Sequence, residues 1–156
     1  MGFSRRGFSL VEVVVVLGIL LVLAAIILPT LGPMRRQGRM RVGAAAVAET
    51  LRLARSLAIT HSAVYCVDFE FSIVPAEMHI ISGDPPSVDH VEKLPEGVEF
   101  FDTGTLPAVG ALNFRPDGSC AGTFTINIRN HDSAADTRRI EVKAASGQIV
   151  VTGGAR

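Results

Sequence analysis

The sequence predicts an α+β protein in which a long N-terminal helix packs on an antiparallel, sandwich-like β-sheet head. Three observations predict this class. Of the 24 residues from Phe8 to Leu31, 17 are Leu, Ile, Val or Phe. Residues 40–61 follow a helical period, and after His61 apolar residues alternate with a period of two. The 156 residues leave room for one modest domain behind the first helix.

The first element is an apolar helix over residues 8–34. Residues 13–34 carry no charge, and a 24-residue helix is about 36 Å long, enough for a hydrocarbon core of about 30 Å. Its apolar side chains favour insertion by about 5 to 10 kcal/mol, against a cost of about 3 kcal/mol for one acidic residue. We therefore expect a transmembrane helix despite Glu12.

Three simpler interpretations of this segment compete. A secretory signal peptide has a shorter apolar core and a small-residue cleavage site, which we do not find here. Arg5 and Arg6 suit a twin-arginine export signal, but the length of the apolar run and its carboxylate weigh against one. A plain single-span anchor explains the hydrophobicity and leaves Glu12 as an unexplained cost.

The start of the chain combines four features: a basic leader ending in Gly7, then Phe8, then Glu12 at the fifth position of the apolar run and Pro29 at its twenty-second. This combination resembles the class III signal of type IV pilins and type II secretion pseudopilins. The resemblance implies that a prepilin peptidase removes residues 1–7 by cutting between Gly7 and Phe8, and that the new Phe8 amine is methylated.

The resemblance also gives Glu12 a role in assembly. Glu12 lies about 6 Å along a helix from Phe8, and the amine created by cleavage is a cation. In a low dielectric a nearby cation makes a buried carboxylate tolerable. We therefore expect the terminal amine of a neighbouring subunit to neutralise Glu12 during assembly. The alternative is a pairing with the amine of its own chain.

The predicted topology follows from the same resemblance, which implies a bacterial inner-membrane protein with a cytoplasmic N-terminus and a periplasmic head. The arginines argue the other way, because the positive-inside rule places the more basic flank in the cytoplasm. Two arginines precede the span and four follow it closely: Arg5 and Arg6, then Arg35, Arg36, Arg39 and Arg41.

The next element is an amphipathic stem helix over residues 35–61. A bend is expected at Pro29 and a pliable joint around Pro33 and Gly38, because proline removes a backbone donor and glycine is a weak helix former. Beyond the joint, helical spacing predicts one buried face, formed by Val47, Leu51, Ala54 and Ala58. Its arginines suit a solvated face, with contacts to other subunits or lipid headgroups as the alternative.

Residues 62–156 form the predicted head. Alternation in 65–71 directs Tyr65, Val67, Phe69 and Phe71 inward. Further strands are expected at 112–115, 123–129, 139–142 and 148–151, with weaker signals at 78–82 and 98–101. Asp117 and Gly118 predict a tight turn. We expect loops at Gly83–Lys93 and Asn130–Thr137.

The tail carries a narrower resemblance. Residues 111–130, ALNFRPDGSCAGTFTINIRN, and 138–151, RRIEVKAASGQIVV, resemble the C-terminal signature of H-type minor pseudopilins and the related FimT pilins. The resemblance implies a non-enzymatic subunit of a type II secretion pseudopilus that helps export folded proteins across the outer membrane. Its partners would be other major and minor pseudopilins, the prepilin peptidase and the inner-membrane assembly platform.

Two other functions remain open. One is a minor type IV pilus subunit involved in priming, adhesion or DNA uptake. Nucleic-acid binding is disfavoured, because residues 61–115 hold nine acidic residues against Lys93 and Arg115, and Gly147–Val150 lacks the basic end of some FimT-like members. The other is an anchored periplasmic enzyme, but no serine lies in a G-x-S-x-G motif.

Histidines and cysteines complete the candidate sites. His61, His79, His90 and His131 lack the spacing of metal ligands, so we expect neither a metal nor another cofactor. Cys66 and Cys120 are the only cysteines. They are either a disulfide, closing a loop of about 55 residues and adding roughly 4 kcal/mol, or two small buried residues.

Overall fold

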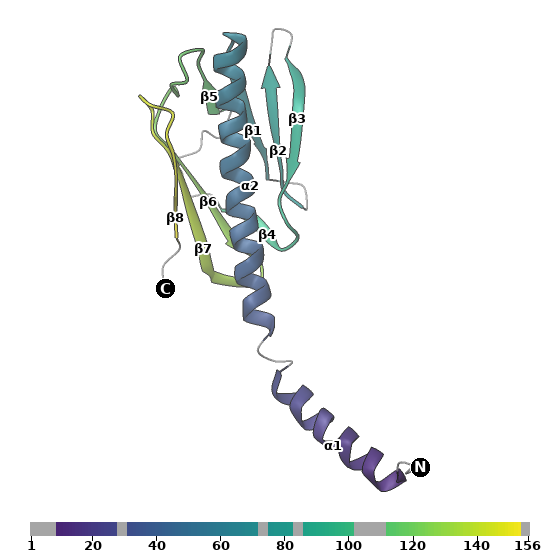
Figure 1. Ribbon diagram of the computed structural model, residues 1–156. Coiled ribbons are helices and arrows are strands. Elements are labelled where there is room, and N and C mark those ends of the chain that lie inside the picture. Colours follow the sequence, from purple (N-terminus) through teal and green to yellow (C-terminus); the bar gives the residue numbers. More distant parts are fainter. Residues whose placement is uncertain (1–8, 28–30, 72–74, 83–85, 102–111, 154–156) are drawn as a thin grey trace, which may run out of the picture. The chain divides into compact units, whose positions relative to one another are not determined.

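The computed structural model (Figure 1) describes residues 9–27, 31–71, 75–82, 86–101 and 112–153. The predicted cleavage site at Gly7 and Phe8 and the predicted bend at Pro29 lie outside these residues. The chain divides into two compact units, residues 1–35 and 36–156. The first unit contains α1 (Leu10–Ile27), and the second contains most of α2 and all of the strands.

Helix α2 (Leu31–His61) is longer than the predicted stem and runs unbroken through Gly38. Pro33 interrupts no hydrogen bond, because it lies in the first turn, where backbone amides have no acceptor within the helix. At the other end, Ser62 has a left-handed φ of 50°. The amide of Ala63 then donates to the carbonyl of Ala58 at 3.2 Å, which closes the last turn.

The buried face of α2 is the predicted one. Val47, Leu51, Ala54 and Ala58 have no exposed surface. Small residues extend this face toward the start of the helix and let the backbone approach the strands. A Cβ added at Gly43 would lie 3.0 Å from the side chain of Val98.

One antiparallel sheet has the strand order β3-β2-β1-β5. It consists of β1 (Tyr65–Glu70), β2 (Glu77–Ser82), β3 (Ser87–Lys93) and β5 (Leu112–Phe114). The inward alternation of Tyr65, Val67 and Phe69 is confirmed, whereas Phe71 lies beyond the strand and is half exposed. The predicted loop at Gly83–Lys93 is wrong over 87–93, where β3 pairs with β2 through a register shift at Ile80 and Ile81.

The other antiparallel sheet has the order β4-β6-β7-β8. It consists of β4 (Val98–Phe101), β6 (Phe124–Asn130), β7 (Ser133–Val142) and β8 (Ile149–Thr152). The predicted loop at Asn130–Thr137 is also wrong, because β7 begins at Ser133 and pairs with β6 up to Asn130. Only a two-residue turn, His131 and Asp132, separates the strands.

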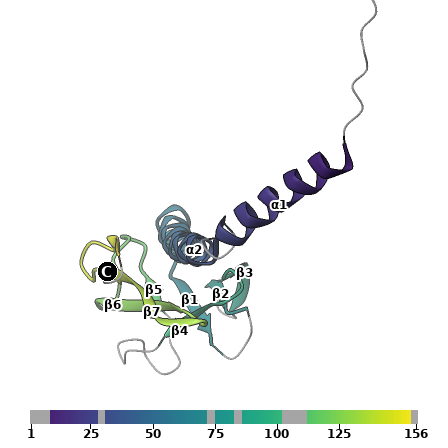
Figure 2. The same cartoon turned by 90° about the horizontal axis from the view of Figure 1, so that it is seen from below.

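Helix α2 packs on both sheets, and Figure 2 shows it end-on above their strands. One continuous core joins the three parts: Leu51 from the helix, Val67 and Ile80 from the first sheet, and Ile126 and Ile140 from the second. All five side chains are fully buried. The predicted α+β class, a helix packed on antiparallel strands, is therefore confirmed.

Arg55 of α2 holds two turns of the head together. Its Nε donates to the carbonyl of Gly118 at 3.0 Å and its Nη2 to the carbonyl of Ser146 at 2.9 Å. Gly147 has a φ of 59°, and a Cβ there would lie 2.1 Å from the oxygen of Gly118. Only glycine fits where the two turns approach so closely.

Candidate functional site

The start of α1 positions Glu12. Ser9 precedes the helix, and the Glu12 amide donates to the Ser9 carbonyl at 3.0 Å. Glu12 is the third helical residue, so Ser9 and Glu12 have the S-x-x-E spacing of a capping box. We missed this signal in the sequence. The spacing gives the carboxylate a local role beside the predicted one, because a negative charge near a helix N-terminus is stabilising.

Helix α1 exposes apolar side chains around its whole circumference. Leu10 is 81% exposed and Leu21 71%. A helix that is apolar all round needs cover from lipid or from other helices. The exposed large side chains of α1 are Leu10, Val11, Val13, Val14, Val15, Val16, Leu17, Ile19, Leu20, Leu21, Val22, Leu23 and Ile26.

None of the helices in the described part of the chain is long and apolar enough to cross a membrane.

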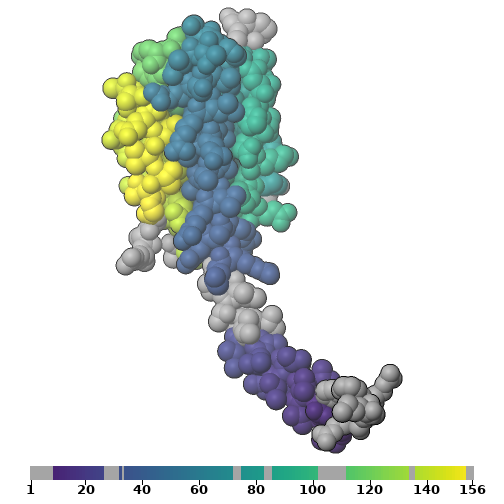
Figure 3. Space-filling view, in the orientation of Figure 1, coloured from purple at the N-terminus to yellow at the C-terminus, as the bar shows by residue number. Residues whose placement is uncertain are grey.

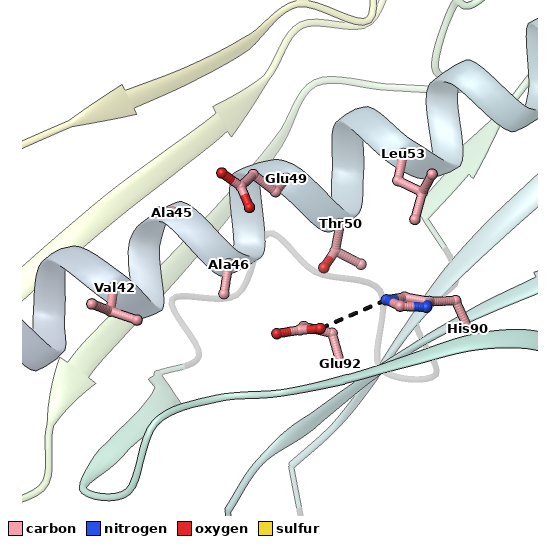
Figure 4. Close-up of a pocket in the computed structure, with 8 residues that line it drawn as sticks. All are labelled: Val42, Ala45, Ala46, Glu49, Thr50, Leu53, His90 and Glu92. Carbon is pink, nitrogen blue, oxygen red and sulfur yellow. Dashed lines mark ion pairs between the residues drawn. The ribbon is translucent and has the colours of Figure 1, made fainter.

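A groove of about 450 Å³ runs between α2 and the edge strand β3 (Figure 4). The helix supplies an aliphatic wall, and the strand supplies His90 and Glu92, whose Nε2 and Oε2 atoms lie 3.6 Å apart. Glu49 adds a second carboxylate from the helix side. The other lining residues are Val42, Ala45, Ala46, Thr50 and Leu53. The sequence analysis did not identify this groove.

The histidines pair with nearby side chains instead of with each other. His79 contacts Glu77 at 3.3 Å, His131 contacts Glu99 at 3.5 Å, and His61 lies 2.5 Å from the hydroxyl of Tyr65. Within the described ranges, no three His, Cys, Asp or Glu side chains are close enough to hold a metal ion.

The two cysteines are free thiols. Cys120 forms a bridge opposite Phe114 and belongs to the core, whereas Cys66 lies opposite Asn113. Paired residues of antiparallel strands share a face and neighbours along a strand alternate, so the two thiols point to opposite faces. The disulfide considered from the sequence is therefore not formed in this structure. Burial raises the pKa of Cys66 to about 11, with a smaller contribution from Asp68, and burial also raises the pKa of Cys120.

Comparisons with known proteins bear on both units. The prokaryotic N-terminal methylation motif matches residues 2–28, which include Gly7, Phe8 and Glu12. No curated protein sequence matches the chain.

Solved structures match most of the chain. The type IV minor pilin FimU of Pseudomonas aeruginosa PAO1 is 14% identical, over 77% of this chain and 92% of that one, with a TM-score of 0.61. The minor pseudopilin EpsH of the Vibrio cholerae type II secretion system is 17% identical, over 74% of this chain and 97% of that one, with a TM-score of 0.57. A second EpsH structure gives 13% identity, 76% and 96% coverage, and a TM-score of 0.57.

These likenesses show a shared fold, and the matched structures are those of pilin subunits. The chain therefore carries the prokaryotic N-terminal methylation motif at its start, and behind it the fold that the minor pilin FimU and the minor pseudopilin EpsH share.

Proposed function

We propose that this protein is a minor pseudopilin, a structural subunit of a type II secretion pseudopilus that helps export folded proteins across the outer membrane. One observation carries the proposal: the methylation motif leads into a helix whose large apolar side chains are exposed throughout the described residues 10–26. Such a helix suits storage in lipid followed by packing against the helices of other subunits. The fold shared with EpsH supports secretion as the setting.

The proposed pathway begins at the inner membrane. The prepilin peptidase cuts between Gly7 and Phe8, and the Phe8 amine is methylated. The segment 8–34 holds the precursor in the membrane, with the N-terminus in the cytoplasm and the head in the periplasm. An inner-membrane platform then transfers it into a filament of major and minor pseudopilins, with no enzymatic step by this chain.

In this proposal Glu12 selects the register of assembly. Its carboxylate can be buried among apolar helices at low cost only when a cation neutralises it, and the methylated amine of an adjacent subunit is such a cation. A subunit that stacks one turn out of register leaves the charge unpaired. The capping-box spacing from Ser9 is compatible with this, because a capping carboxylate keeps free lone pairs.

The second candidate is a minor subunit of a type IV pilus. The fold shared with FimU favours it as much as the EpsH likeness favours secretion. The two candidates share processing, methylation and assembly chemistry and differ in the machine that they serve. Genes for a secretin and several other pseudopilins beside this gene would favour secretion, and a retraction motor gene would favour the pilus.

The test is the mass of the N-terminal peptide of the full-length protein extracted from its native membrane. A peptide that starts at Phe8 and carries one methyl group supports assembly of either kind. An intact Met1 start overturns both candidates. A gene deletion then separates them: loss of secreted proteins from the medium identifies a pseudopilin, and loss of surface pili with normal secretion identifies the minor pilin.

A further inference from the structure

Helix α2 divides the exposed face of the head. Figure 3 shows it running between the C-terminal strands on one side and β2 and β3 on the other. On the β3 side lies the groove of about 450 Å³, with Glu49 and Glu92 at its edges. The side chain of Glu92 is 41% exposed, and that of His90 beside it is equally exposed. The groove is therefore open and acidic.

The other flank of the exposed helix face is basic. Arg41 and Arg52 are exposed and lie eleven residues apart, which is about three helical turns, so both point the same way. We call these two residues the arginine flank. Among the described residues, neither of them nor Glu49 forms an ion pair. Glu49 on one flank and the two arginines on the other thus have no oppositely charged partner among the residues that the structure describes.

We propose that the groove between α2 and β3 binds the arginine flank of α2 from a second copy of this chain. The groove matches the arginine side chain in both its charged end and its apolar stem. Glu49 and Glu92 can accept hydrogen bonds from guanidinium groups, while Val42, Ala46 and Leu53 offer aliphatic surface to the methylene stems of the arginines.

The groove and the arginine flank are different surfaces, so this contact is heterologous. A pair of subunits joined in this way leaves one free groove and one free flank. The inference rests on the proposed function, because a filament subunit needs a lateral contact with its neighbours. It assigns a lateral contact of the heads, separate from the packing of the apolar helices.

The experiment uses the full-length chain in a bacterial membrane. A photo-reactive benzoylphenylalanine replaces Leu53, which lines the groove and is 40% exposed. The matched control carries the same probe at Phe101, which is 37% exposed and ends a strand of the other sheet. Irradiation is expected to link the probe at position 53 to α2 of a second copy, identified by mass spectrometry, and to give no such product from position 101.

Charge reversal then tests whether the acidic groove of one copy binds the basic flank of the other. A groove variant carries Glu49→Arg and Glu92→Arg, and a flank variant carries Arg41→Glu and Arg52→Glu. Each variant alone should lower the cross-linked yield at least about fivefold. The yield should return when the groove variant, with the probe, is co-expressed with the flank variant. Pairing of Glu49 with Arg52 inside one helix cannot explain this rescue, because it is broken in both chains.

Every outcome decides the inference. Unchanged yield in the single variants, no rescue in the mixed pair, or a linked product that contains a different protein overturns it. Fluorescence of Tyr65, the only tyrosine in a chain without tryptophan, checks that each variant head is folded. The N-terminal mass is measured on the same membranes. Processed protein without the cross-link refutes this contact alone, whereas an intact Met1 refutes the proposed function.

Discussion

The guanidinium of Arg55 lies 3.0 Å from the carbonyl oxygen of Gly118, which ties the C-terminal part of α2 to the turn that follows β5. The same side chain reaches the carbonyl of Ser146 in the turn before β8. These two turns belong to the two segments of the C-terminal signature recognised in the sequence. One arginine therefore joins both segments of that signature to the helix.

Replacing Arg55 with Ala should destabilise the head by about 1 to 3 kcal/mol, because two charge-assisted hydrogen bonds are lost and carbonyl groups are left unpaired. Urea unfolding of the full chain in mild detergent, followed by Tyr65 fluorescence, measures the change. Arg52→Ala is the matched control, since Arg52 is exposed on the same helix, and should change stability by less than about 0.5 kcal/mol. Equal losses in the two variants would show that Arg55 has no special role.

Two substitutions at Glu12 distinguish helix capping from charge as its contribution. Glu12→Gln keeps a residue that can cap the helix but removes the carboxylate, and Glu12→Leu removes both. If charge directs assembly, both variants insert into the membrane normally and both lose incorporation into filaments. Sheared filaments and membrane fractions, probed with an antibody to the head, give the two amounts. Normal incorporation of Glu12→Gln would assign Glu12 to helix capping alone.

Glu99 makes stability depend on pH. Its carboxylate accepts a hydrogen bond from Arg129 Nε at 2.5 Å, and this bond, with a smaller contribution from His131, holds its pKa below the usual value of 4.5. The folded pKa is the lower one, so the stabilisation is fully present above the unfolded value and is lost as the pH falls through the folded value.

Glu99→Gln should therefore be less stable than the parent chain at neutral pH, by about 1 kcal/mol or less for so exposed a pair, and the difference should shrink in acid. Urea unfolding at a series of decreasing pH values measures it. Arg129→Gln, which removes the partner and keeps the carboxylate, should produce the same narrowing. A difference that is constant with pH would exclude Glu99 as its source.

The thiols of the partly buried Cys66 and the buried Cys120 should react slowly. The pKa of Cys66 is raised from 9.0 to about 11, so its thiolate is about 100-fold scarcer near neutral pH than in an unfolded chain. Iodoacetamide is expected to label the native protein slowly and both cysteines rapidly in urea, with identical mobility on reducing and non-reducing gels. Resistance of both cysteines to labelling in urea without reductant would instead indicate a disulfide.

The sequence identified the elements whose burial is periodic. The face of α2 through Val47 and Leu51 and the alternation of Val67 and Phe69 were predicted because one side of each element contacts the core. β3 was not predicted, because neither of its faces is buried in the core. Val88 and Val91 are exposed, and the strand is held by backbone pairing to β2, which leaves no alternating pattern.

Contacts between segments far apart in the chain could not be predicted from the sequence either. Arg55 was assigned to a solvated face, but its acceptors lie 63 and 91 residues further along the chain. The groove is lined by α2 and by a strand about forty residues later in the chain, and neither segment alone has a sequence pattern that predicts a groove. At the N-terminus the motif pointed to Glu12, while the capping spacing from Ser9, visible in the sequence, was overlooked.

The order in which the core is synthesised has a consequence for biogenesis. Helix α2 leaves the ribosome early, yet Ile140, which packs in the same core, and Ser146, which Arg55 binds, come close to the end of the chain. Until they emerge, the apolar face of the helix has no complete partner, and early collapse would favour aggregation. The core can therefore close around α2 only after nearly the whole chain has been made.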